Sequence, residues 1–201
     1  MSSRPAVRAT LAFALVVCAA GAYAQAPAST LPPEPPPTPV PAEYSEEARR
    51  GYAAVLKDAR ELMAQRRHDA AIAKLDALAA ERPREPQARF LKSIAQSEAG
   101  RPDDAMATLA ALAADFPELP EVHNNLAVLH AARGNLDLAR RELELALAAA
   151  PDYAPAHENL GDVHARLAID AWTRASSLDK GKPSASLAAK LRRVAEALAS
   201  R

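Results

Sequence analysis

The amino-acid sequence repeats itself every 34 residues, and this period limits what the chain can fold into more than any other feature. Identical residues recur at this interval in three consecutive segments: Ala71, Ala105 and Ala139; Leu75, Leu109 and Leu143; Pro83, Pro117 and Pro151. A period of roughly 20–50 residues is typical of arrays in which each unit buries its apolar face against the next one. The sequence therefore predicts a stack of similar units.

Composition indicates that these units are helical. Phe, Trp and Tyr make up only 4% of the 201 residues, whereas hydrophobic residues make up 49%, with alanine and leucine the dominant types. Strands favour β-branched and aromatic side chains, while alanine and leucine favour helices. We expect an all-α chain of one or at most two domains.

The first 24 residues read as a secretory signal peptide. Arg4 and Arg8 precede an apolar run at residues 11–20, and Ala22 and Ala24 flank Tyr23 as an A-x-A cleavage site. The run is shorter than the about 20 residues that a spanning helix needs, so we expect no stable membrane insertion. Cleavage near Ala24 would make the protein periplasmic or secreted.

Cys18 suggests a lipoprotein anchor as an alternative to cleavage near Ala24. Val17 precedes it, where lipid-modification signals usually carry a small residue, so the anchor is the less favoured interpretation. Residues 25–43 are rich in proline and are expected to form an extended linker. This linker is either a spacer or a proline-rich ligand for a partner domain.

The charged residues are balanced and scattered. The chain has 25 basic and 25 acidic side chains, which give a formal net charge of 0. Nucleic-acid binding depends on concentrated Lys and Arg. We therefore expect no nucleic-acid partner.

The stretch HNNLAVLHAARGNLDLARRELELALAAAP, residues 123–151, resembles a tetratricopeptide repeat (TPR). The matching residues are Leu126, Ala127, Gly134, Leu136, Ala139, Leu143, Ala146, Leu147 and Pro151. The resemblance covers about two thirds of the chain and implies a solenoid of helical hairpins. The chain is similar to exported, periplasmic TPR proteins of proteobacteria, some of which act as adaptors in cell-envelope processes.

The repeats are expected to occupy residues 44–179, as units at about 52–85, 86–119 and 120–153 and a truncated unit at 154–179. In the fourth unit Ala168, Trp172 and Ala175 come five residues earlier than the period requires. The turn between its two helices is therefore missing, and no Gly or Pro interrupts residues 166–178. We expect one continuous helix at about 155–178 in place of the last hairpin.

A last helix is expected within residues 180–201, beginning near Ser184. Its apolar face comprises Leu187, Leu191, Val194 and Leu198, spaced at i, i+4, i+7 and i+11. Such a helix usually caps the exposed end of a solenoid. The alternatives are a dimerisation helix or a membrane-surface helix.

Asn125 and Asn159 are the leading candidates for ligand binding. They lie 34 residues apart, at a position that in TPR proteins faces the concave groove, and a carboxamide can both donate to and accept from a peptide backbone. Asn124, Val128, Glu158 and Asp162 would border the groove. The alternative is that these asparagines hydrogen-bond a neighbouring turn.

Four histidines also repeat at this interval, namely His123 with His157 and His130 with His164. Within a helix, i and i+7 lie about 10.5 Å apart, too far to share one ion. An inter-repeat pair such as His123 with His157 is the geometric alternative, but we expect the histidines to pack between helices and expect no metal site. No Gly-rich phosphate loop, G-x-S-x-G or H-E-x-x-H motif is present. We expect a protein that is not an enzyme and has no cofactor.

The predicted function is therefore a non-enzymatic interaction module that binds a peptide or protein in the concave groove. The alternative is a structural protein that self-associates as a homodimer through its C-terminal helix.

Overall fold

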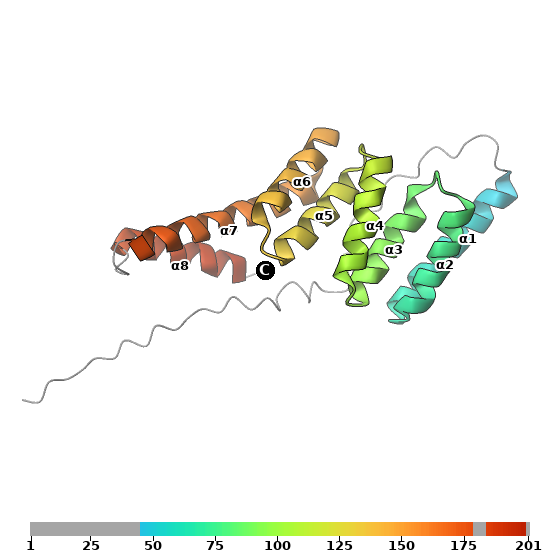
Figure 1. The fold of residues 1–201 in the computed structure, drawn as a ribbon, viewed down its shortest axis with the longest axis horizontal. Helices are drawn as coiled ribbons and strands as arrows, with labels where there is room; N and C mark the ends of the chain where they lie inside the picture. The colour runs from blue at the N-terminus through green and yellow to red at the C-terminus, as the bar shows by residue number, and fades with distance from the viewer. Residues whose placement is uncertain (1–44, 179–183, 200–201) are drawn as a thin grey trace, which may run out of the picture. The chain divides into compact units, whose positions relative to one another are not determined.

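The computed structural model describes residues 45–178 and 184–199, and all of the regular structure within them is helical. In chain order the helices are α1 (Glu46–Ala64), α2 (His68–Glu81), α3 (Pro86–Glu98), α4 (Pro102–Asp115), α5 (Pro120–Ala132), α6 (Leu136–Ala149), α7 (Ala154–Leu178) and α8 (Ala185–Ala199) (Figure 1). The predicted all-α, TPR-like fold is confirmed. The predicted signal peptide (1–24) and linker (25–43) lie outside the described residues.

Each helix packs against the next one along the chain, and α5 also contacts α7. The alanines of the 34-residue period explain this close packing, because Ala71, Ala105 and Ala139 are completely buried. With no side chain beyond Cβ, they let neighbouring helices approach closely, as interiors at crystal-like density require. Leu75, Leu109 and Leu143 are buried beside them.

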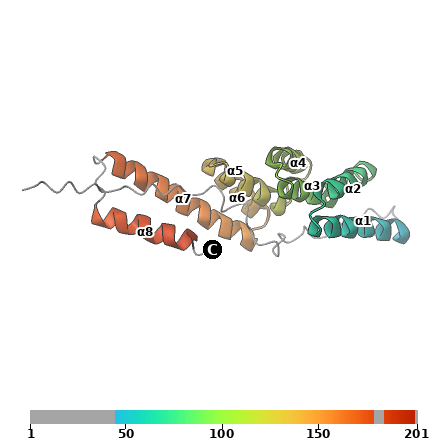
Figure 2. The same ribbon diagram turned by 90° about the horizontal axis from the view of Figure 1, so that it is seen from below.

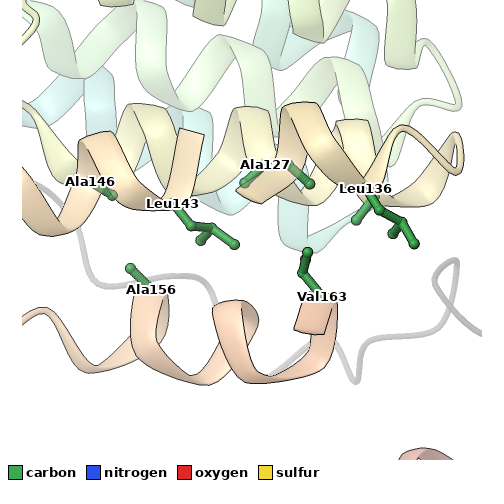
Figure 3. Packing of buried hydrophobic residues seen from close by; sticks show 8 residues of the cluster. Ala127, Leu136, Leu143, Ala146, Ala156 and Val163 are labelled. Carbon is green, nitrogen blue, oxygen red and sulfur yellow. The ribbon is translucent and has the colours of Figure 1, made fainter. Parts of the chain in front are cut away.

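The last part of this core joins α5, α6 and α7. In Figure 3, Ala156 of α7 points toward Leu143 and Ala146 of α6, and Val163 points toward Ala127 of α5 and Leu136 of α6. Ala156 and Val163 are the two buried residues of α7, so its first half is held to the stack and its second half is not buried in it. Burying a side chain of valine size contributes about 1.5–3 kcal/mol.

The three hairpin turns share one hydrogen-bond pattern. The amides of Arg67, Arg101 and Asn135 each donate to the carbonyl five residues earlier, which closes a Schellman motif. Gly100 and Gly134 supply the left-handed residue at φ 75° and 77°. In the first turn the equivalent residue is Arg66, at φ 59°, so the turn forms even where the sequence lacks the glycine.

The fourth unit is one uninterrupted helix, as predicted. α7 has 25 residues, and no residue between 166 and 170 has a positive φ. Ser184 begins the last helix, as predicted, and its Oγ accepts from the Leu187 amide at 3.2 Å. Ser45 caps α1 in the same way, because its Oγ accepts from the Ala48 amide at 3.2 Å.

α8 lies beside the second half of α7 in both views of the fold (Figures 1 and 2). Its apolar residues Leu187, Leu191, Val194 and Leu198 are half-buried, and no residue of α8 is fully buried. The Lys190 ammonium lies 6.0 Å from the centroid of the Trp172 ring. Among the described helices, none is both long enough and apolar enough to cross a membrane.

The turn geometry predicts stability changes of opposite sign. We expect Gly134→Ala to lower the free energy of unfolding by about 1 kcal/mol, because a left-handed residue with a Cβ is strained. Arg66→Gly should raise it by up to about 1 kcal/mol, since relief of that strain exceeds the extra entropy of an unfolded glycine. Urea titration measures both changes.

Gly161→Ala is the matched control, because Gly161 lies inside α7 with open space around the added Cβ. It should stabilise the protein by about 0.5–1 kcal/mol. Equal effects of Gly134→Ala and Gly161→Ala would contradict this account of the turns.

Candidate functional site

The six residues predicted to line a groove lie on two helices that contact each other. α5 contributes Asn124, Asn125 and Val128, and α7 contributes Glu158, Asn159 and Asp162. We call these six residues together the α5–α7 surface.

The asparagines differ in what they can offer a ligand. Asn159 Nδ2 donates to Asn124 Oδ1 at 2.8 Å, and Asn124 is only 3% exposed. Asn125 Nδ2 donates to the main-chain oxygen of Glu121 at 2.8 Å. The repeat period related Asn159 to Asn125, but the crossing of α5 and α7 brings it to Asn124.

The other members of the surface are more accessible. Val128 and Asp162 are half-exposed, and Glu158 is exposed. Ile94, one period before Val128, is also half-exposed, but it packs against three core clusters. A ligand on the α5–α7 surface would contact Val128 on α5 and the acidic side chains of Glu158 and Asp162 on α7.

Sequence reasoning missed Glu121, which lies in the first turn of α5. Its side chain is 5% exposed, and its Oε2 has no hydrogen-bond partner among the described residues. Burial raises the pKa of Glu121, although a hydrogen bond from its own backbone amide opposes that shift. One feature of the sequence could have pointed to Glu121. It lies three and four residues before Asn124 and Asn125, a spacing that places the three residues on one face of a helix.

Tyr153 lies in the turn between α6 and α7 and packs against the core cluster of α5, α6 and α7. It is half-buried, and its buried hydroxyl also has no hydrogen-bond partner within the described residues. Burial, and secondarily the negative charge of Glu121, raises the pKa of Tyr153 to about 12. Glu121 Oε2 in α5 and the Tyr153 hydroxyl before α7 are thus both buried without a hydrogen-bond partner among the described residues.

His123 has a structural role, as predicted. It is buried, with Nδ1 at 2.8 Å from Glu142 Oε2 and Nε2 at 3.1 Å from the Pro117 oxygen. Both partners are acceptors, so the ring binds best with both nitrogens protonated. The hydrogen bond to Glu142 is the main cause that raises the pKa of His123 above its usual value.

The packing prediction is wrong for His157 and His164, which are exposed. His157 keeps the equivalent bond, from Nε2 to the Pro151 oxygen at 2.8 Å. The reason is that the fourth unit has no second helix of a hairpin to cover this face of α7. Within residues 45–178 and 184–199, no group of three or more His, Cys, Asp or Glu side chains could hold a metal ion.

A hollow of about 270 Å³ lies elsewhere, between α1 and α2. Its lining comprises Asp58, Glu61, Leu62, Gln65, Arg67 and Lys74. The Lys74 ammonium donates to Asp58 Oδ2 at 3.1 Å across it. The hollow does not include any residue of the α5–α7 surface.

Comparison with protein-family models matches the tetratricopeptide repeat at residues 62–129 and again at 98–167, which together span more than half of the chain. Comparison with curated protein sequences found no match.

Solved TPR structures share the fold at low identity. The TPR domain of Sgt2 from Aspergillus fumigatus has a TM-score of 0.55 at 14% identity, covering 77% of this chain and 92% of that one. The Yersinia enterocolitica type III secretion chaperone SycD, in complex with a peptide of the translocator YopD, has a TM-score of 0.53 at 14% identity, with coverage of 61% and 98%. The second TPR domain of human RPAP3, in complex with the HSP70 peptide SGPTIEEVD, has a TM-score of 0.51 at 14% identity, with coverage of 57% and 97%.

The His123–Glu142 contact predicts a pH-dependent stability. Because the folded pKa of His123 lies above its usual value of 6.5, the contact stabilises the fold fully below that value and is lost as pH rises through the folded pKa. Glu142→Gln should lower the free energy of unfolding by about 1–2 kcal/mol at about pH 5.5, and by less at about pH 9.

Glu144→Gln provides the control, because Glu144 is an exposed carboxylate on the same helix that pairs with Arg140. Its effect should be under about 1 kcal/mol at both pH values. A loss for Glu142→Gln that does not change with pH would contradict the charged state assigned to His123.

Proposed function

Because the chain belongs to the tetratricopeptide repeat family, we propose that it is a non-enzymatic protein-interaction module that binds an extended peptide segment on the α5–α7 surface. The observation that carries this proposal is that the half-exposed Val128 of α5 and the acidic Glu158 and Asp162 of α7 lie on two helices in contact. Exposed side chains on a rigid helical scaffold are well suited to binding, because little order is lost when a ligand docks.

Similar structures support a peptide as the ligand. SycD was solved with a peptide of YopD, and the second TPR domain of RPAP3 with an HSP70 peptide. That HSP70 peptide ends in Glu-Glu-Val-Asp, whereas the α5–α7 surface itself contains Glu158 and Asp162. Like charges repel, so we expect the partner of this chain to differ from such acidic peptides.

The setting that we propose is the bacterial cell envelope, where the protein would act as an adaptor. The support is the N-terminal sequence, whose charged start, apolar run and Ala22 and Ala24 fit an exported protein. We expect N-terminal sequencing of the protein from its native host to begin at Gln25. A chain that still begins at Met1, or a lipid attached to Cys18, would contradict this localisation.

Site-specific photo-crosslinking tests the binding surface. Val128 is the best position, because changing Asn124 or Asn159 would also break the hydrogen bond between them. We expect a photoreactive residue at 128 to crosslink a partner in host extract. The matched control is Leu138 of α6, an apolar residue that is 43% exposed. Equal crosslinking from both positions would remove the α5–α7 surface as the site.

Self-association is a second candidate function, favoured by the incomplete burial of α8. Its four apolar residues are only half-buried against α7, and a second copy could cover the remainder. This candidate predicts a dimer by light scattering that becomes a monomer in Leu191→Glu but not in Arg193→Glu, which changes an exposed residue of the same helix. A monomeric full chain would exclude it.

A further inference from the structure

The charged residues are balanced over the whole chain but not along its length. Residues 102–165, from α4 to the first half of α7, have 11 acidic and three basic side chains. Residues 171–178 of α7 and 184–199, which include α8, have one acidic and four basic side chains. We call these last two segments the C-terminal helical pair. The pair is therefore a positively charged end that follows an acidic stretch.

The basic side chains of the C-terminal helical pair are all exposed, namely Arg174 of α7 and Lys190, Arg192 and Arg193 of α8. The single acidic residue, Glu196, lies 3.9 Å from the Arg192 guanidinium. Both side chains of that ion pair are largely in solvent, where such a pair contributes little. The cations of the pair are therefore available to an anionic partner.

The apolar side of α8 is held to the fold only weakly. Its residues Leu187, Leu191, Val194 and Leu198 are half-buried, and no residue of α8 is fully buried. The two buried residues of α7 both lie in its first half, so α8 can separate from α7 without opening the core. Leu178, the last residue of α7, is 81% exposed. It lies at the end of α7 from which α8 returns (Figures 1 and 2).

Trp172 lies between the charged and the apolar side chains of the pair. It is half-buried, it is the only tryptophan in the sequence, and its ring centroid is 6.0 Å from the Lys190 ammonium. A tryptophan ring has an apolar body and a polar N–H, and it is enriched where water meets the apolar interior of a membrane. The pair therefore combines exposed cations, a loosely held apolar face and a tryptophan.

We propose that the C-terminal helical pair binds the surface of a membrane that contains anionic lipids, with α8 lying in the plane of the headgroups. The four apolar residues of α8 and Trp172 would enter the boundary between headgroups and acyl chains. Lys190, Arg192 and Arg193 would contact lipid phosphates, because long basic side chains can extend from the apolar face to the headgroups. This inference goes beyond the proposed function and does not depend on the α5–α7 surface.

The combination of charge and apolar surface favours an anionic bilayer over other partners. A second copy packed through α8 would bring three further cations to the contact, and like charges oppose such an interface. A nucleic acid would bind the cations but would leave the four apolar residues without a partner. An anionic bilayer matches both features of α8.

The test uses protein purified from its native host and two kinds of lipid vesicle. One kind contains phosphatidylcholine and phosphatidylglycerol at 3:1, and the other contains phosphatidylcholine alone. We expect the anionic vesicles to bind at least about tenfold more tightly, since each basic residue near such a surface contributes about fivefold. Binding should shift the emission of Trp172 to shorter wavelengths, and the single tryptophan makes this signal specific to the pair.

Two double variants with the same change in charge separate the role of α8 from that of net charge. Arg192→Gln with Arg193→Gln should weaken binding to the anionic vesicles at least about tenfold. Arg140→Gln with Arg141→Gln on α6 is the matched control and should preserve binding. Each variant removes two adjacent arginines, of which one pairs with a glutamate four residues later. Circular dichroism should show the same helix content in both.

Four results would overturn the inference. The first is the absence of both cosedimentation and a Trp172 shift with anionic vesicles. The second is equal binding to the two kinds of vesicle, and the third is equal loss of binding in the two double variants. The fourth is a dimer by light scattering that does not bind vesicles, because it would assign the apolar face of α8 to a second copy. Each of these leaves the α5–α7 surface and its crosslinking test unaffected.

Discussion

The structure depends on the close contact that three buried alanines permit between neighbouring helices. Ala71, Ala105 and Ala139 have no exposed surface, and a larger side chain at any of them would force the helices apart or into strained packing, at a cost of about 1–3 kcal/mol. Repetition of this contact every 34 residues gives each unit the same geometry. The first helices of successive units thereby present equivalent positions, and the α5–α7 surface is built from them.

The continuous helix α7 leaves the last unit of the array less covered than the preceding ones. A hairpin in the fourth unit would cover its first helix, as α6 covers α5. The continuous helix leaves His157 and His164 exposed and buries only Ala156 and Val163. Just before α7, Tyr153 is half-buried against the same cluster. The end of the array is thus less completely buried than its interior.

The sequence predicted the features that follow from local rules. The alanine and leucine period predicted the TPR-like fold, and the five-residue shift of Ala168 and Trp172 predicted the continuous helix. It could not predict which side chains meet across α5 and α7, because that depends on the angle and separation of the two helices. For this reason the Asn124–Asn159 bond and the buried carboxylate of Glu121 came from the structure alone. The binding role of the six predicted residues stays a prediction.

The continuity of α7 sets the position of every α7 residue on the proposed surface. Pulsed electron paramagnetic resonance tests this continuity by measuring the distance between two spin labels. The labels are attached at Ala154→Cys and Arg174→Cys in a Cys18→Ala background. One helix predicts a separation of about 30 Å, since 20 residues rise at about 1.5 Å each. A hairpin would bring the labels to roughly half that distance or less, because paired helices pack about 8–10 Å apart. The short distance would contradict the fold of the fourth unit and the surface derived from it.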